Sequence, residues 1–285
     1  MTKEPIRFKK ERELGEILSA TFKFLRENYK ALFGVLLKTT GPALALLLLS
    51  LAFYSFQTVG SIGVQSMFSG GTALLATAIL LITYLVYYAA LTGTIYHSIR
   101  SYISHEGQII PQEVYSGVKS DFGNLLAISV ISGLLVFFGF LLLLIPGIYV
   151  AVPLSLAPAI IVFRNKSVFD AISDCFELVK NNWWATFGSI IVISIIVYIV
   201  GLVFQIPTII YFIIKTMTVF QEGTLADPSS MFDTGYIIMN IISSMIQYII
   251  YGITPIGFAF VYFHLNEKKH FTGTYETIQN LGKKD

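Results

Sequence analysis

The chain has little of what a soluble enzyme is built from. Charged residues make up only 13% of its 285 residues, against about 25% in soluble domains. A single cysteine, Cys175, excludes a disulfide within the chain and a metal site built on cysteines. The sequence has no P-loop, metalloprotease histidine pair, nucleophile elbow or glycine-rich dinucleotide turn. We therefore expect no catalytic, cofactor or metal site, and we expect the protein not to be an enzyme.

Apolar residues dominate the composition instead. They make up 55% of the chain, and the mean hydropathy is +0.72. A membrane-spanning helix needs about 20 mostly apolar residues, and the long apolar runs predict an all-α integral membrane protein with one domain over residues 1–285. The six predicted spans cover approximately residues 31–56, 72–97, 122–145, 147–163, 185–204 and 236–263.

Several spans contain expected breaks. Lys38 and Gly41-Pro42 interrupt the first span, and the third and fourth form a tight hairpin that turns at Pro146-Gly147. The fourth contains two prolines and is only 17 residues long, roughly 25 Å, so we expect it to be kinked and packed inside the protein. Residues 207–220 are expected to continue beyond Pro207 at the outer interface, although their inclusion in a span stays open.

The basic residues fall on one side of the predicted spans. Eight Lys and Arg residues precede the first span, and others follow the second, fourth and sixth spans. The loops on the opposite side contain none. The positive-inside rule then predicts that both termini, residues 1–12 and 266–285, are cytoplasmic tails, and that the protein lies in a bacterial inner membrane.

An internal repeat shows how the chain enters the membrane. Residues 18–34, LSATFKFLRENYKALFG, recur as ISDCFELVKNNWWATFG at 172–188 with six identical positions, where average residue usage gives about one. Both copies belong to charged amphipathic segments, residues 13–28 and 167–182, which we predict to be helices lying in the cytoplasmic interface. Two interpretations of their apolar faces stay open, namely contact with lipid and packing on the protein's own cytoplasmic ends. The two apolar faces are Leu14, Ile17, Leu18, Thr21, Phe22 and Leu25, and Val168, Ala171, Ile172, Cys175, Phe176 and Val179.

The segment from 144 to 188 carries a recognisable pattern. A Pro-Gly hairpin and a proline-containing helix precede an amphipathic stretch of the form A-I-x-x-(S/C)-x-x-L-(V/I)-K, and N-W-W then opens a span. This pattern resembles a group of bacterial membrane proteins that includes the membrane domain fused to some glycerophosphoryl diester phosphodiesterases. The resemblance implies a multi-span helical domain of unknown activity. It does not carry over the phosphodiesterase activity, which belongs to a separate soluble barrel domain that is absent from this sequence.

Polar residues within the spans are the only candidates for a functional site. Lys38 is the clear charge in the first span; it either binds an anionic headgroup or substrate in a cavity, or extends to the cytoplasmic interface. A polar stripe in the sixth span is expected to face inward, where it either joins helices by hydrogen bonds or lines a polar pathway. The stripe consists of Asn240, Ser243, Ser244, Gln247, Tyr251 and Thr254.

The remaining polar residues disfavour ion-coupled transport and catalysis. No acidic residue lies inside a predicted span, which disfavours a proton- or ion-coupled pump. His97 and His264 lie near the cytoplasmic ends of spans without a carboxylate partner in the spans, so interfacial packing explains them. The basic patches FRNK and EKKH suit anionic lipid better than nucleic acid.

Our leading hypothesis from the sequence is a non-enzymatic, lipid-contacting scaffold or accessory protein. Its expected partners are membrane lipids, with an anionic leaflet on the cytoplasmic side, and we expect no nucleic-acid partner. The alternative is a transporter or exporter of a small anionic or lipid-like solute, through a path lined by Lys38 and the sixth span. An intramembrane enzyme is disfavoured because the sequence suggests no acid–base pair.

Overall fold

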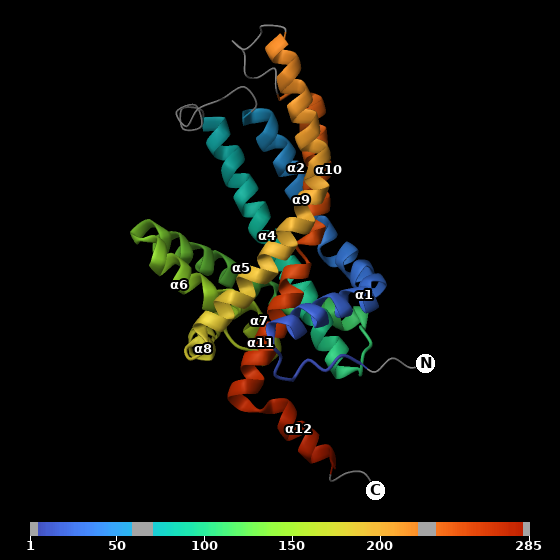
Figure 1. The fold of residues 1–285 in the computed structure, drawn as a ribbon, viewed down its shortest axis with the longest axis vertical. Coiled ribbons are helices and arrows are strands. Elements are labelled where there is room, and N and C mark those ends of the chain that lie inside the picture. Colours follow the sequence, from blue (N-terminus) through green and yellow to red (C-terminus); the bar gives the residue numbers. More distant parts are fainter. Residues whose placement is uncertain (1–4, 59–70, 222–231, 282–285) are drawn as a thin grey trace. The chain divides into compact units, whose positions relative to one another are not determined.

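A computed structural model describes residues 5–58, 71–221 and 232–281, and no strand occurs in these ranges (Figure 1). Five helices in this part of the chain are long and apolar enough to cross a membrane, or six if the bent pair α1 and α2 counts as one span. The all-α, multi-pass class predicted from the sequence is therefore confirmed. The helices are α1 (Leu14–Thr39), α2 (Gly41–Thr58), α4 (Gly71–Ser104), α5 (Pro111–Leu142), α6 (Leu144–Leu154), α7 (Ala157–Arg164), α8 (Val168–Val179), α9 (Trp183–Gln221), α10 (Thr234–Ile250), α11 (Ile253–His270) and α12 (Thr272–Leu281).

The chain packs as two compact units. Unit 1 combines Met1–Thr40, Tyr88–Ile195 and Gly252–Asp285, whereas unit 2 combines Gly41–Tyr87 and Ile196–Tyr251. Both units therefore join segments that are far apart in the sequence. The helices α4 and α9 each contribute residues to both units.

Unit 2 is an apolar helical unit. Its helix α2 packs against α10, the Ser50 and Thr83 hydroxyl oxygens lie 2.6 Å apart, and the Tyr87 hydroxyl donates to the Tyr248 carbonyl at 2.5 Å. Residues 41–87 contain no Lys, Arg, Asp or Glu, and the charged residues of 196–251 all lie between 215 and 233. Unit 2 thus has the composition of a membrane-embedded bundle.

Unit 1 is built around α11, in which every residue from Pro255 to Phe263 is buried. The ring of Phe8 stacks on Phe260 with centroids 4.5 Å apart. Arg12 is also buried, and its guanidinium donates to the Phe8 carbonyl at 2.8 Å. Phe8 and Arg12, in the segment predicted to be a cytoplasmic tail, therefore pack into the core of unit 1.

The C-terminal segment is also ordered by packing within unit 1. The carboxylate of Glu267 accepts hydrogen bonds from the backbone N–H groups of Gly273 at 2.7 Å and Thr274 at 2.9 Å. These donors belong to the first turn of α12, whose N–H groups have no partner inside the helix. Glu267 thus fixes the start of α12, which lies within the segment predicted to be the C-terminal cytoplasmic tail.

The first amphipathic segment and the start of the first span form one helix. Sequence reasoning placed the surface helix at 13–28 and the span at 31–56, but α1 runs without a break from Leu14 to Thr39. The break comes at Thr40, before the Gly41-Pro42 pair noted in the sequence. Proline lacks a backbone N–H and fits the first turn of a helix, so it begins α2 rather than extending α1.

Pro207 does not end the fifth helix. The span was expected to stop near residue 204 and residues 207–220 to continue it at the outer interface, yet α9 is one helix of 39 residues with Pro207 inside it. A proline in an apolar helix is tolerated where neighbouring groups satisfy the backbone that it leaves free. The residues on both sides of Pro207 are mostly apolar and include no run of turn-forming residues, so this sequence favours a helix over a turn.

The hairpin between α5 and α6 turns earlier than expected. Leu143 alone separates the two helices, with extended backbone angles of φ −165° and ψ 152°, and Pro146-Gly147 lies inside α6. A Cβ added at Gly139 would lie 2.9 Å from the Cα of Gly147, so these glycines let the two backbones approach closely.

The fourth span is kinked and internal, as predicted. Residues Ser155 and Leu156 separate α6 from α7, and Pro158 lies in the first turn of α7. In the segment Leu144–Arg164, 61% of the apolar 18-residue stretch is buried inside the protein. The corresponding share is 22–28% in the other four candidate spans.

The close approach of α5 and α6 predicts opposite effects for two glycine substitutions in α5. Gly139→Ala should destabilise the protein by about 1–3 kcal/mol because the new methyl group overpacks against Gly147. Gly133→Ala is the matched control, since a Cβ there has no neighbour within 4 Å; it should stabilise the helix by about 0.5–1 kcal/mol. Unfolding of both variants in detergent measures the difference, and equal stabilities would contradict the close approach.

Candidate functional site

Lys38 lies on the surface of unit 1. Its side chain is exposed, and its ammonium group sits 5.8 Å from the centroid of the Tyr115 ring on α5. An exposed lysine of this kind is compatible with the interpretation in which a long cationic side chain extends to the interface. The anion-binding interpretation required a cavity around Lys38, which its exposure does not provide.

The polar stripe of the sixth span divides into two parts. The helix breaks at Tyr251 and Gly252, so Thr254 belongs to α11 while the other stripe residues belong to α10 or its end. The amide of Gln205 on α9 donates to Gln247 at 2.7 Å, and Gln247 donates to the Tyr251 hydroxyl at 2.8 Å.

A second contact of the stripe lies one turn away. The Ser243 and Thr208 hydroxyl oxygens are 2.8 Å apart, whereas Asn240 and Ser244 are half-buried. The stripe therefore joins α9 to α10 through side-chain hydrogen bonds, which is the interhelical alternative considered from the sequence.

A histidine–carboxylate pair was missed by sequence reasoning. The Nε2 atom of His97 lies 3.0 Å from the Asp121 carboxylate, because α5 begins at Pro111 and carries Asp121 into the packed part of unit 1. A Cβ at Gly117 would lie 2.3 Å from the ring nitrogen of His97, so glycine makes room for the imidazole. His97 is only 6% exposed, which makes the pair a packed interhelical contact.

Lys215 belongs to a polar cluster at the start of α10. The Asp233 carboxylate accepts from Lys215 at 2.8 Å, the Tyr211 hydroxyl at 2.9 Å and the Tyr236 backbone N–H at 2.9 Å. These bonds, that of Lys215 above all, lower the pKa of Asp233 to about 2. Lys215 therefore connects α9 to the N-terminus of α10, a role that sequence reasoning did not assign to it.

The depressed pKa of Asp233 predicts an acid-labile contribution to stability. A carboxylate with a folded-state pKa below its unfolded value stabilises the protein above the unfolded pKa and loses this effect as pH falls through the folded pKa. For Asp233 that window runs from about pH 4 to about pH 2. Thermal unfolding of the native protein and Asp233→Asn across this window should show a steeper decline for the native protein, and parallel curves would refute the role of Asp233.

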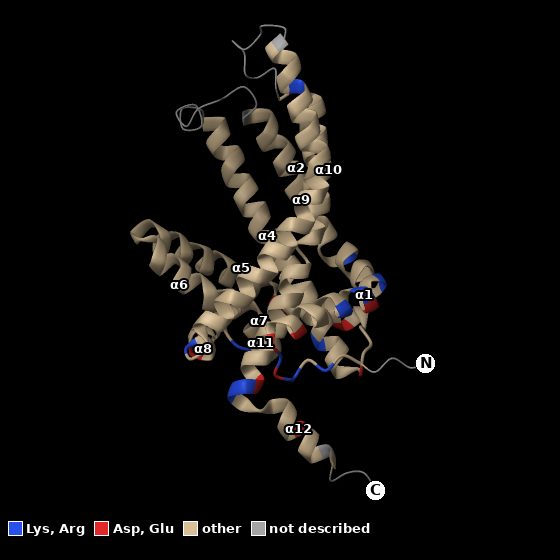
Figure 2. Ribbon diagram, in the orientation of Figure 1, with Lys and Arg blue, Asp and Glu red and all other residues tan. Residues whose placement is uncertain are grey.

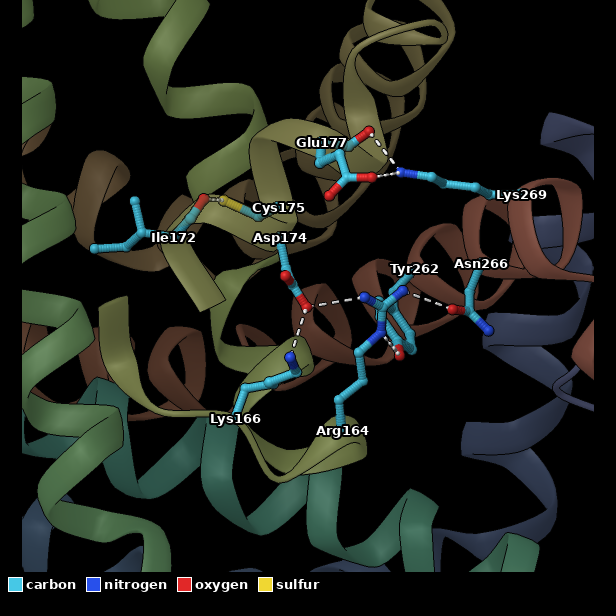
Figure 3. Close-up of polar contacts among 9 residues, drawn as sticks. All are labelled: Arg164, Lys166, Ile172, Asp174, Cys175, Glu177, Tyr262, Asn266 and Lys269. Carbon is cyan, nitrogen blue, oxygen red and sulfur yellow. Dashed lines mark hydrogen bonds and ion pairs between the residues drawn. The ribbon is translucent and has the colours of Figure 1, made fainter. Parts of the chain in front are cut away.

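One guanidinium joins three helices of unit 1 (Figure 3). Arg164, at the end of α7, donates to Asp174 on α8 at 3.0 Å and to Asn266 on α11 at 2.7 Å. Its Nε atom also donates to the Tyr262 hydroxyl at 3.1 Å, and Lys166 lies 3.8 Å from the same carboxylate of Asp174. Arg164 uses its fork of donors in different directions at once, which lysine cannot reproduce.

A hollow lined by cations lies beside this cluster. It has a volume of about 600 Å³, and its lining includes three lysines and two asparagines from the α8–α9 turn and the end of α11. Lys268 donates to the Asn182 side chain at 2.8 Å, and Lys269 donates to Glu177 at 2.5 Å, which lowers the pKa of that carboxyl. Lys180 is exposed at the hollow. An excess of positive charge with amide donors suits a phosphate or carboxylate group.

Two tryptophans open α9 next to the hollow. Trp184 is 77% exposed, while the Trp183 ring stacks on Tyr149 of α6 at 5.7 Å and its indole N–H donates to the Tyr149 carbonyl at 3.2 Å. Exposed tryptophans and tyrosines beside basic residues are typical of the boundary between headgroups and acyl chains.

The two copies of the repeat differ in what they cover. On α8 the stripe residues Ala171, Cys175 and Val179 are buried against unit 1, which supports packing on the protein's own ends. On α1 the stripe residues Leu14 and Phe22 are more than one-third exposed. The buried face of α1 is shifted around the helix and consists of Ile17, Thr21, Phe24, Leu32 and Val35.

Neither a protein-family model nor a curated protein nor a solved structure matches the chain. The resemblance to the membrane domain of glycerophosphoryl diester phosphodiesterases stays a prediction. Within the described ranges, no three or more His, Cys, Asp or Glu side chains are placed to hold a metal ion.

The Arg164 cluster predicts unequal effects of removing its two cations. Arg164→Ala should destabilise unit 1 by about 2–4 kcal/mol, because it removes three hydrogen bonds and leaves Asp174 short of a partner. Lys166→Ala should cost less than about 1 kcal/mol, since its contact with Asp174 is long and its side chain is 43% exposed. Chemical unfolding in detergent distinguishes the variants, and a loss of similar size in both would disprove the central role of Arg164.

Proposed function

We propose that the protein is a non-enzymatic, multi-pass scaffold or accessory protein that holds anionic lipid at the cationic hollow. The observation that carries this proposal is the juxtaposition of Lys180, Lys268 and Lys269 with the two tryptophans at the start of α9, of which Trp184 is exposed and Trp183 is half-buried. The hollow offers charge and hydrogen-bond donors to a phosphate headgroup, and the aromatic pair offers apolar surface to its acyl chains. With the positive charges facing the cytoplasm of a bacterial inner membrane, both termini lie on that side.

The exposed face of α1 supports the same proposal. Phe22, Tyr29, Phe33 and Leu37 are exposed along this helix at 38–62%. Basic residues lie between them, and the Lys30 ammonium sits 5.9 Å from the centroid of the Tyr29 ring. A helix that presents aromatics and lysines together suits the surface of an anionic leaflet.

The contacts of the polar residues favour this function over transport. A transporter was expected to use Lys38 and the sixth span, but Lys38 is exposed and Gln247 bonds to Gln205 and Tyr251. Side chains that bond to each other offer little to a passing solute. The imidazole of His97 is likewise buried and already paired with Asp121, as suits a contact between two helices.

The two tryptophans give a direct test of lipid binding. They are the only tryptophans in the chain, so brominated lipid that reaches the hollow will quench the intrinsic fluorescence of Trp183 and Trp184. Brominated phosphatidylglycerol should quench at lower mole fraction than brominated phosphatidylcholine. The variant Lys180→Gln/Lys268→Gln should weaken the anionic-lipid effect roughly tenfold or more, since each lysine at an anionic surface contributes about 1 kcal/mol.

A matched double variant controls for total charge. Lys119 and Lys166 lie outside the residues that line the hollow, and Lys119→Gln/Lys166→Gln removes the same two charges. This control should keep the native preference for phosphatidylglycerol. Equal quenching by both lipids in the native protein, or equal loss in both double variants, would eliminate the hollow as a headgroup site.

A further inference from the structure

The hairpin formed by α5 and α6 has an apolar tip that the protein leaves uncovered. Figure 1 shows the two helices side by side, reaching away from the rest of unit 1. The side chains at the tip are 66–78% exposed. These residues are Leu141, Leu142, Leu143, Leu144 and Ile145.

No charge accompanies this exposure. Between residues 133 and 154 the only side chain with a polar group is that of Tyr149, and Figure 2 shows the hairpin free of charged residues near its tip. A continuous exposed apolar surface of this kind marks an interaction site. In a chain with several membrane-spanning helices, the acyl chains of the bilayer are the occupant that matches it.

The turn differs from the other turns expected on the outer side. The segments QTVGSIGVQSMFSGG and QEGTLADPSSMFDTG are rich in Gly, Ser and other polar residues, as suits a loop among headgroups and water. The hairpin turns on a single leucine flanked by leucines. A turn of this composition fits the hydrocarbon and not the opposite headgroup layer.

The returning helix α6 is too short to cross by itself, and only together with α7 does the segment Leu144–Arg164 reach the length of a candidate span. α6 has 11 residues and is roughly 16 Å long, about half of the ~30 Å hydrocarbon core. Its successor cannot complete the crossing against lipid, because α7 is buried in unit 1 from Ala157 to Val162.

An aromatic group at the side of the hairpin marks its depth. Tyr149 lies six residues beyond Leu143 and stacks on Trp183, whose neighbour Asn182 belongs to the lysine-lined hollow. Six residues of helix span roughly 9 Å, so a tip that points into the bilayer reaches at most about 9 Å below the aromatic level. Interfacial elements bury their apolar faces by about 5–10 Å.

Crossing does not require the hairpin. The apolar segments of unit 2 lie in α2, α4, α9 and α10, and the shortest whole helix among them, α10, has 17 residues. Four crossings keep both termini on one side, as six would. A re-entrant hairpin is therefore compatible with the predicted placement of both termini on one side.

We propose that the α5–α6 hairpin is re-entrant: it inserts into one leaflet of the bilayer and returns to the side from which it entered. Its partner is the acyl-chain layer of that leaflet, contacted by the leucine tip and by Phe137, Phe138 and Phe140. This inference does not rest on the lipid-binding function proposed above, because a hairpin can insert into a leaflet of any headgroup charge.

Cysteine labelling in proteoliposomes tests the proposal. The native Cys175 is fully buried, and burial raises the pKa of its thiol to about 12, so the native protein serves as the unlabelled reference. Leu143→Cys should resist a charged, membrane-impermeant maleimide even after a pore-forming peptide opens the vesicles. The exposed controls Gln57→Cys and Glu106→Cys should label fully under the same conditions. Leu142→Cys, at a position that is 73% exposed, provides a second tip variant if the first folds poorly.

Depth-dependent quenching separates the remaining outcomes. A bimane fluorophore at residue 143 should be quenched more strongly by a lipid with a mid-chain nitroxide than by one with a headgroup nitroxide, whereas Trp183 and Trp184 should show the reverse order. Maleimide labelling with strong headgroup quenching would mean that the hairpin crosses and would overturn the proposal. Labelling without lipid quenching would place the tip in water and would overturn it as well. The anionic-lipid preference of the hollow is measured separately and can fail without affecting these results.

Discussion

The requirement that buried backbone groups find partners inside the protein shapes this molecule more than any other constraint. Helices satisfy this requirement within one segment, which is why apolar sequences in lipid form helices. Hydroxyl side chains in the packed regions return to the carbonyl one turn earlier, as Thr94 does to Ala90 and Ser98 does to Thr94. Polar residues therefore occur inside the helices without opening a path through them.

At each break between helices, the backbone N–H groups that start the next helix need hydrogen-bond acceptors from outside that helix. The break between α11 and α12 is covered by Glu267, and the start of α10 is covered by Asp233. The turn between α5 and α6 has no such side chain, because Leu143 is followed at once by a new helix and its N–H donates to the Gly139 carbonyl at 3.2 Å. The helix ends capped by Glu267 and Asp233 thus suit polar surroundings, whereas the turn at Leu143 suits apolar surroundings.

Sequence reasoning predicted the features that depend on neighbouring residues. Apolar runs gave the helical class, Gly41-Pro42 gave the break after Thr40, and Pro158 gave the kink in the fourth span. The sequence also predicted a continuation beyond Pro207 and left open whether residues 207–220 belong to a span, and in the structure α9 continues through Pro207 as one helix. In α1 a charged stretch and an apolar stretch form one helix, because nothing between them breaks the hydrogen-bond ladder.

Contacts between distant segments were not predictable from the sequence. His97 and Asp121 lie on different helices, and the distance between them depends on the packing of α4 against α5. The sequence shows that Arg164 is basic. Its hydrogen bonds to Asp174 and Asn266 could not be predicted, because they depend on how three helices pack together. The repeat predicted two similar amphipathic helices, yet burial differs between them because α8 packs on several helices and α1 keeps part of its apolar face exposed.

The stacking of Phe8 on Phe260 has a consequence for biosynthesis. The two rings are separated by 251 intervening residues, and the site that receives Phe8 is completed by α11. Domains tend to fold in the order of synthesis when their contacts are local. The segment that carries Phe8 is synthesised long before the α11 site that receives it, so this part of unit 1 can close only after α11 has been made.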